Sequence, residues 1–240
     1  MMKQLVVLLL RSPLRRPLEA LFERLNAWTI EVMKRAHKSY VRPRNWSNAE
    51  LRKFAPLYSG DVINVSGWKD EDKNGGKYRD YFSNAASYSI SNTQGARGVS
   101  TPTDIYLDLE GELPEHLKHR YQIAFNHTVL EHIYDIKKAV ANICALSNDT
   151  VILVTPFLQQ VHYEPGSYGD YWRPTPAAIE RMLADNGFTV IYQSANDNPW
   201  YIVYLFTVAT RRPALYATLP MTRMPDRGLG MSAFGLSEGS

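Results

Sequence analysis

The sequence predicts an α/β sandwich with a mostly parallel sheet. Short apolar runs alternate with segments of helical periodicity along most of the 240-residue chain, an order typical of strands and helices packed in layers. The run Thr150–Thr155 has four consecutive apolar residues at its centre, as in a strand that helices cover on both faces. The last two runs lie close together in the chain, which predicts an antiparallel pair at one edge of the sheet.

Seven strands and two well-marked helices follow an N-terminal helical region. The predicted strands are Asp61–Val65, Tyr88–Ser91, Ile105–Leu107, Gln122–Phe125, Thr150–Thr155, Thr189–Tyr192 and Tyr201–Ala209. One helix is predicted over Asp135–Leu146, which has a single apolar face. A second is predicted over Thr175–Asn186, because Thr175 can cap its start, Pro176 suits its first turn and Gly187 can end it in the left-handed conformation.

The N-terminal region is expected to be helical and amphipathic. The apolar run at 5–10 is far shorter than the roughly 20 residues that span a bilayer, and no signal-peptide cleavage site follows it, so we expect neither secretion nor a membrane span. Residues 14–35 combine apolar residues at helical spacing with interleaved Arg and Lys. Such a helix could pack on the domain or on a partner subunit in a homo-oligomer, or rest on an anionic membrane surface.

Three regions are therefore predicted: an amphipathic helical region at 1–45, an α/β domain at 46–215 and a flexible tail at 216–240. The formal charge of +3, with acidic residues throughout the chain, gives little support to a nucleic-acid partner. The single cysteine, Cys144, excludes an internal disulfide and fits a core position in a reducing compartment. We expect a cytoplasmic protein, located at the inner membrane face if the N-terminal helix binds lipid.

Polar segments that follow the predicted strands carry the functional signal, because ligands of open α/β sheets bind beyond the carboxyl ends of the strands. "FNHTVLEHI" (125–133) follows the fourth strand, and "VTPFLQQVHYEPGSYGDYWRPTPAAIERMLADNGFTVI" (154–191) runs from the fifth strand into the sixth. Both segments resemble class I S-adenosylmethionine-dependent methyltransferases, in order and spacing, over roughly residues 58–210. The resemblance implies a Rossmann-like three-layer sandwich. Within that superfamily the chain is most similar to methyltransferase-like proteins of bacterial surface-polysaccharide biosynthesis, which implies methyl transfer to a sugar, glycan or glycan-lipid intermediate.

The resemblance also implies which residues would contact S-adenosylmethionine. These are Asn64, Ser66, Gly67, Trp68, Asn92, Asp108 and Asn126. Asp108 matches the acidic position that meets the adenine amino group, and Asn126 and His127 match positions that line the methionine end. Asn64 stands where Asp is usual, and Ser66 and Trp68 stand where glycines are usual.

These departures make the first two motifs of the family degenerate. Asn92 replaces the carboxylate that accepts both ribose hydroxyls and offers only one oxygen. Each lost charge-assisted bond would weaken binding by about 1–2 kcal/mol. Trp68 must either swing aside or fill the cofactor's space. Two alternatives therefore stay open: a methyltransferase-fold binding or scaffolding protein without catalysis, and an enzyme that uses a sugar nucleotide for glycosyl transfer.

Methyl transfer to a hydroxyl needs positioning and a general base. The candidate bases are His127, His162 and Asp170, and Tyr171 and Arg173 are candidates for binding an anionic or sugar substrate. Structural roles are equally open for His162, Asp170 and Arg173, which could brace a long loop. Glu131 and His132 are expected to cap and orient the following helix. No histidine spacing in the sequence fits a metal site, so no metal is expected.

Overall fold

The computed structural model describes residues 15–36, 43–93, 104–157, 159, 161–196 and 204–216. The chain divides into two units, one that ends at Val41 and one that begins at Arg42, and each is described by itself. The tail predicted at 216–240 lies, from residue 217 onward, outside the described residues.

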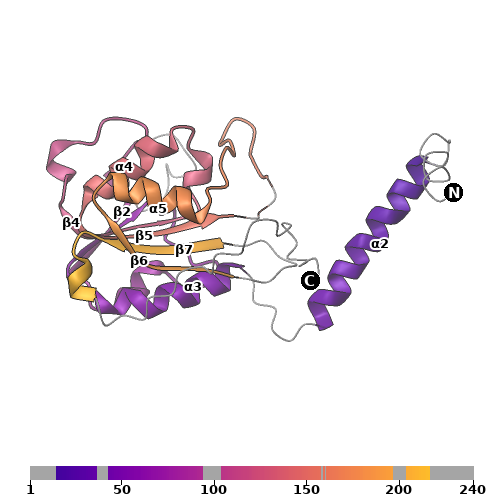
Figure 1. Ribbon diagram of the computed structural model, residues 1–240, viewed down its shortest axis with the longest axis horizontal. Helices are drawn as coiled ribbons and strands as arrows, with labels where there is room; N and C mark the ends of the chain where they lie inside the picture. The colour runs from indigo at the N-terminus through magenta and orange to yellow at the C-terminus, as the bar shows by residue number, and fades with distance from the viewer. Residues whose placement is uncertain are drawn as a thin grey trace, which may run out of the picture. The chain divides into compact units, whose positions relative to one another are not determined.

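A seven-stranded sheet forms the centre of the second unit, in the order β3-β2-β1-β4-β5-β7-β6 (Figure 1). Its strands are β1 Asp61–Val65, β2 Ser87–Asn92, β3 Ile105–Tyr106, β4 Tyr121–His127, β5 Ser147–Pro156, β6 Thr189–Ala195 and β7 Tyr204–Thr210. Neighbours from β3 to β5 are parallel, and β7 is antiparallel to both β5 and β6. The predicted mostly parallel sheet and the antiparallel pair at its edge are confirmed, with the reversed strand β7 lying one place inside β6.

Helices cover the two faces of this sheet. Helices α4 (Ile136–Leu146) and α5 (Pro176–Asp185) lie on one face and α3 (Pro43–Phe54) lies on the other (Figure 1). Each face buries its own apolar cluster, the first around the two later helices and the second around α3 and the aromatic residues of the segment after β1. Burial of these apolar surfaces is the main force holding the three layers together.

The ends of α5 follow the predicted capping chemistry. The Thr175 hydroxyl accepts a hydrogen bond of 3.2 Å from the Ala178 amide, which satisfies one of the free donors of the first turn. Gly187 has a φ of +78° just past the last turn, a conformation that strongly favours glycine.

The segment between β1 and β2 departs from simple strand–helix alternation, because residues 66–86 form turns and the short 3₁₀ helix Tyr78–Tyr81. Asp72 is 2% exposed and holds the turn in place, because its carboxylate accepts hydrogen bonds from the amides of Asn74 and Gly76 and from the Tyr81 hydroxyl. Tyr78 and Tyr81 then pack in the second apolar cluster beside α3. Buried polar turns and aromatic side chains thus occupy the place where a helix would follow the first strand.

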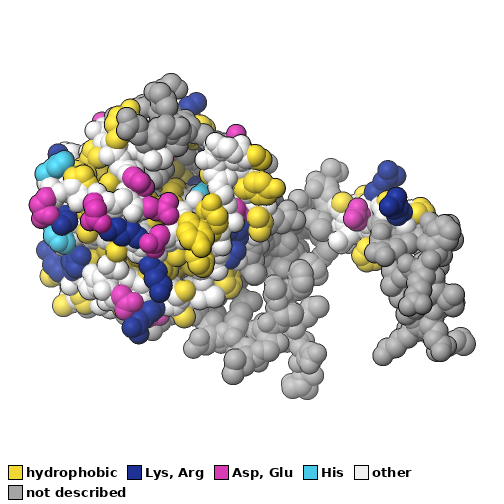
Figure 2. All heavy atoms as spheres, turned by 90° about the horizontal axis from the view of Figure 1, so that it is seen from above, with side chains coloured by type: hydrophobic (Ala, Val, Ile, Leu, Met, Phe, Trp, Pro, Cys, Tyr) yellow, Lys and Arg dark blue, Asp and Glu magenta, His cyan; other side chains and the backbone are white. Residues whose placement is uncertain are grey.

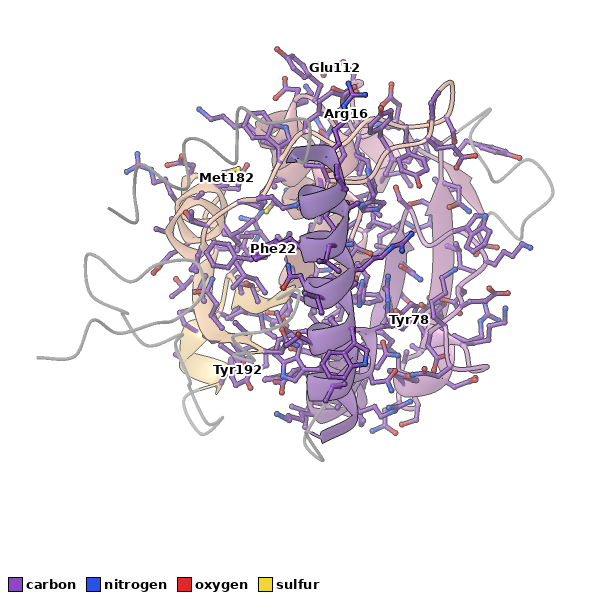
Figure 3. All side chains as sticks on the ribbon, turned by 90° about the vertical axis from the view of Figure 1, so that its right-hand side faces the viewer. Arg16, Phe22, Tyr78, Glu112, Met182 and Tyr192 are labelled. Atoms are coloured by element: carbon purple, nitrogen blue, oxygen red, sulfur yellow. The ribbon has the colours of Figure 1, made fainter. Side chains whose placement is uncertain are left out.

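Helix α2 (Arg15–Ala36) belongs to the first unit. Among its described side chains, these large apolar ones are exposed: Leu21, Phe22, Leu25, Trp28 and Val32. Figure 3 shows Arg16 and Phe22 projecting from this helix. No helix among the described residues is long and apolar enough to cross a membrane. On the face of the α/β unit seen in Figure 2, acidic and basic side chains are intermingled.

Candidate functional site

A cavity of about 660 Å³ lies at the carboxyl ends of the central strands. The chain runs outward from β1 to β3 and returns to β4 on the other side of β1, so the sheet reverses its strand order at the β1–β4 pair, where α/β sheets bind ligands. The volume suits a ligand of nucleotide size. Nine of the residues singled out from the sequence line it: Asn64, Ser66, Gly67, Trp68, Asn92, Asp108, His127, His162 and Tyr171.

Two non-glycine residues of the turn after β1 have a left-handed backbone. Ser66 and Trp68 have φ values of +56° and +46°, conformations that cost a non-glycine residue roughly 1–2 kcal/mol each. Hydrogen bonds to the end of β2 hold the turn: the Gly67 amide donates to the Ser91 carbonyl at 3.1 Å, and the Trp68 amide donates to Asn92 Oδ1 at 2.7 Å. The Asn92 side chain therefore stabilises the turn after β1.

A buried carboxylate organises the same turn from below. Asp70 is 2% exposed and accepts from Asn64 Nδ2 at 2.8 Å, from the Tyr88 hydroxyl at 2.7 Å and from the Arg79 amide at 3.1 Å. A Cβ on Gly67 would lie 2.5 Å from Asn64 Nδ2, so only glycine permits this approach. The amide of Asn64 thus has a local role, since it donates to Asp70.

The Trp68 side chain lies at the wall of the cavity. Lys73 Nζ lies 4.1 Å from the centre of the indole ring and Lys69 Nζ lies 5.0 Å from it, distances at which cations bind the face of an aromatic ring. Trp68 lines the cavity together with Asn92 and Asp108, and the volume of about 660 Å³ exists beside it. The indole therefore narrows the cavity and leaves room for a ligand.

The end of β4 carries a buried histidine beside an arginine. His127 is 8% exposed, and Arg44 Nη1 from α3 lies 2.5 Å from its Nδ1. Burial, followed by the nearby Arg44 charge, holds the pKa of His127 well below its ordinary value. Since a guanidinium can only donate, His127 accepts through Nδ1 as a neutral ring. A group held neutral in this way is a poor acceptor of a substrate proton.

Aromatic and imidazole side chains form the opposite wall. The His132 ring packs edge to face against His162 and Tyr168, with centroid distances of 5.0 and 4.5 Å. His132 Nδ1 donates to the Gly169 carbonyl at 2.6 Å, which leaves its Nε2 as an acceptor. Burial lowers the pKa of His132. His162 Nδ1 lies 3.4 Å from Asp170 Oδ2, without a hydrogen bond within the described part of the chain, so His162 borders the cavity with a carboxylate behind it.

Asp170 and Arg173 form a buried ion pair behind this wall. The Asp170 carboxylate is fully buried and accepts from Arg173 Nη2 at 2.6 Å and from the His162 amide at 2.6 Å. The Arg173 hydrogen bonds hold the pKa of Asp170 below its ordinary value, which keeps it ionised and unsuited to accept a proton itself. Neither residue lines the cavity, and neither does Asn126, whose Nδ2 donates to the Val65 carbonyl at 2.9 Å.

Glu131 is a buried carboxyl with an unusual environment. It is 1% exposed, and its Oε2 has no hydrogen-bond partner in the described structure. Burial raises its pKa to about 8, so the group is largely protonated at neutral pH. Its Oε1 lies 3.7 Å from His132 Nε2. Its backbone carbonyl accepts from the Tyr171 amide at 2.7 Å, which ties the wall to the helical turn after β4.

Several cavity residues carry no signal in the sequence that would place them there. Arg44, Tyr78 and Thr128 line the cavity, and Arg44 comes from a helix more than eighty residues before its partner His127. Tyr78 is labelled in Figure 3. Among the described residues, no group of three or more His, Cys, Asp or Glu side chains is arranged to hold a metal ion.

Comparisons with known proteins place the fold. No protein-family model matches the chain, and no curated protein does. The chain is similar to the crystal structure of an S-adenosylmethionine-dependent methyltransferase from Mesorhizobium loti, at 13% identity and a TM-score of 0.51, over 70% of this chain and 98% of that one. It is also similar to the [4+2]-cyclase SpnF, at 10% identity and a TM-score of 0.50, over 70% and 81% of the two chains.

A third solved structure, magnesium protoporphyrin IX methyltransferase from Synechocystis with bound S-adenosylmethionine, is 17% identical with a TM-score of 0.47, over 70% of this chain and 79% of that one. Similarity at such low sequence identity is evidence for the fold alone. The strand order and the likeness to the Mesorhizobium loti enzyme show that this chain has the Rossmann-like fold of S-adenosylmethionine-dependent methyltransferases.

Proposed function

We propose that this protein transfers a methyl group from S-adenosylmethionine to a sugar or glycan acceptor. The observation that carries the proposal is the position of the cavity at the reversal of strand order, in a fold shared with methyltransferases. The cavity collects residues from the ends of β1, β2, β3 and β4, as expected of a ligand site in an open α/β sheet.

The residues of the cavity fit this cofactor in size and, with one exception, in chemistry. About 660 Å³ accommodates a nucleoside with an amino-acid arm. Asp108 lies just after β3, where its carboxylate can accept from an adenine amino group, and Gly67 also lines the cavity. The exception is Asn92, whose Oδ1 already accepts from the Trp68 amide. Weaker binding of the ribose is the expected consequence.

The side chains of this chain then perform positioning and proton transfer. The cofactor would supply a methyl group activated by its sulfonium. His162 is the proposed general base, because it lines the cavity and Asp170 Oδ2 lies 3.4 Å from its Nδ1. The buried Arg173–Asp170 pair fixes that carboxylate and keeps it ionised. His127, neutral beside Arg44, lines the cavity and does not take up the proton.

The sugar or glycan acceptor rests on the resemblance in sequence to proteins of bacterial surface-polysaccharide biosynthesis. Tyr171 supports it, since its ring lines the cavity, is 52% exposed and can stack on a sugar. Work on a glycan-lipid would place the protein in the cytoplasm at the inner membrane face. The exposed apolar side chains and the interleaved arginines of α2 suit a membrane surface or a second copy of the chain.

Flotation on anionic vesicles separates these two roles of α2. A variant with Leu25→Asp and Trp28→Asp loses flotation if the helix binds lipid. If the helix instead joins two copies, the same variant changes the mass measured by light scattering and leaves flotation unchanged.

A protein that no longer methylates is the second candidate. Asn92 and Trp68 favour it, because they tie up or narrow the ribose end of the cavity. A [4+2]-cyclase is among the solved structures with this architecture, and fold alone does not fix chemistry.

Calorimetric titration with S-adenosylmethionine and with S-adenosylhomocysteine tests the proposal. We expect saturable binding of both, and Asp108→Ala should weaken it at least tenfold. Asp185→Ala, which removes an exposed carboxylate paired with Arg181 on α5, is the matched control and should leave affinity unchanged. Absence of binding at millimolar ligand would overturn the methyltransferase proposal.

A further inference from the structure

Arg44 is a cation that lines the cavity and is held by neutral groups. Its Nη1 donates to the Tyr78 hydroxyl at 3.1 Å and lies 2.5 Å from His127 Nδ1, and its Nη2 donates to the Thr128 hydroxyl at 3.1 Å. The guanidinium carbon lies 5.7 Å from the centre of the Tyr204 ring. These contacts fix the guanidinium at the end of β4 and use only part of its five N–H donors.

Three described arginines of the α/β unit have no carboxylate partner, namely Arg44, Arg120 and Arg211, and of these only Arg44 lines the cavity. Within the described residues it makes no ion pair at 4.0 Å or less. By contrast, these arginines each lie within 4.0 Å of an acidic side chain: Arg52, Arg79, Arg173, Arg181 and Arg212. A partly buried cation without a counter-ion is unfavourable, so an anion bound at Arg44 would stabilise the site.

Glu131, a buried acid that interacts electrostatically with Arg44, does not supply that charge. Burial raises its pKa to about 8 and keeps it largely protonated at neutral pH. The other carboxylates of the cavity wall are Glu71, Asp108 and Glu110, and none of them forms an ion pair with Arg44 within the described structure. The wall at Arg44 is therefore basic, while the wall at the end of β3 is acidic.

We propose that Arg44 is an anion subsite of this cavity and binds a carboxylate or phosphate group of the ligand. A planar guanidinium recognises two oxygens of such a group at once. Because neutral partners already hold the guanidinium in place, little side-chain freedom is lost when an anion binds. Ser47 supports the arrangement: its hydroxyl lies 2.9 Å from His127 Nε2 and donates to the Arg44 carbonyl at 3.0 Å.

Two sources can provide the anion, and the choice between them rests on the proposed function. One is the carboxylate of the cofactor's amino-acid arm, and the other is a phosphate or carboxylate on the acceptor. Titration of Arg44→Gln with S-adenosylhomocysteine and with 5′-methylthioadenosine, which lacks the amino-acid arm, tests the first. Titration with glucose 1-phosphate and with glucose tests the second.

If the subsite binds the cofactor, Arg44→Gln should weaken the binding of S-adenosylhomocysteine tenfold or more and leave the affinity for 5′-methylthioadenosine unchanged. If the subsite binds the acceptor, Arg44→Gln should cause the same loss of affinity for glucose 1-phosphate and no loss for glucose. Arg44→Lys, which keeps the charge without the planar fork, should fall between the wild-type protein and Arg44→Gln. Arg181→Gln, an exposed arginine on α5, should match the wild-type protein with every ligand.

The titrations distinguish failure of the proposed subsite from failure of the proposed function. Nucleoside ligands that fail to bind, together with Arg44-dependent binding of glucose 1-phosphate, refute methyl transfer and support the subsite. Wild-type affinity of Arg44→Gln for both anionic ligands overturns the subsite and leaves the methyltransferase proposal standing. If no anionic ligand binds the wild-type protein, the subsite is overturned as well. Thermal unfolding of each variant checks the fold, and if Arg44→Gln does not fold, Arg44→Lys and the comparison of ligands on the wild-type protein give the same decision.

Discussion

Replacement of Glu131 by glutamine should stabilise this protein at neutral pH. Burial raises the pKa of Glu131 from its ordinary value of 4.5 to about 8, so the folded protein holds a proton that the unfolded chain has released. Because its pKa is raised on folding, the contribution of Glu131 to the free energy of unfolding is largest below pH 4.5 and falls as the pH rises to 8. At pH 7 the loss amounts to about 3 kcal/mol, from roughly 1.4 kcal/mol per unit between 4.5 and 7. Glutamine is neutral at every pH and removes this term.

Thermal unfolding between pH 5 and pH 8 measures the effect. For a domain of this size, about 3 kcal/mol corresponds to roughly 6–12 °C in Tm, so Glu131→Gln should unfold well above the wild-type protein at pH 7 and close to it at pH 5. Glu112→Gln is the matched control, because Glu112 is exposed and pairs with Lys138 at 2.8 Å, and it should have little effect at either pH. Parallel Tm–pH curves for Glu131→Gln and the wild-type protein would refute the protonated state of Glu131.

Three further substitutions test the elements that frame the site. Thr175→Ala removes the hydroxyl that caps α5 and should lower the free energy of unfolding by about 1 kcal/mol in urea denaturation; an unchanged midpoint would show that the cap is idle. Gly187→Ala places a Cβ on a residue with a φ of +78° and should cost about 1 kcal/mol, whereas a gain in stability would mean that the turn adopts another conformation. Asp70→Ala leaves the Asn64 amide, the Tyr88 hydroxyl and a backbone amide without their shared acceptor; it should cost about 3 kcal/mol or more and weaken nucleoside binding, and wild-type stability would exclude Asp70 as the organiser of the turn.

The sheet could be predicted from the sequence because its signals are local. A strand such as β5 contains a continuous run of apolar residues, a pattern that is visible in the sequence without knowledge of the fold. All seven strands lie where such runs predicted them. The ends of α5 were equally readable, since Thr175 and Gly187 act within one turn of their own positions. The segment after β1 was not, because its buried acids, such as Asp72, read as ordinary polar turn residues.

The candidate site could be predicted where a residue ends or follows a strand, or where it lies in the segment after β5 that resembles the family, as His162 and Tyr171 do. Asn64, Asp108 and His127 meet at one edge of the sheet because parallel strands end there. Arg44 arrives from α3 through packing between distant segments, which no spacing in the sequence reveals.

The sequence prediction that Glu131 and His132 cap the following helix is wrong, because Asp135 caps α4 by accepting from the Lys138 amide. The raised pKa of Glu131 depends on burial that only the folded chain creates.

The most direct test of the central claim, that the cavity at the end of the sheet is a cofactor site, is a crystal structure of the protein grown with millimolar S-adenosylhomocysteine. We predict density for the ligand in the cavity between the ends of β1 and β4, with the adenine beside Asp108 and the sulfur end toward His127. Crystals whose cavity remains empty at that concentration, or whose ligand lies elsewhere on the molecule, would contradict the account.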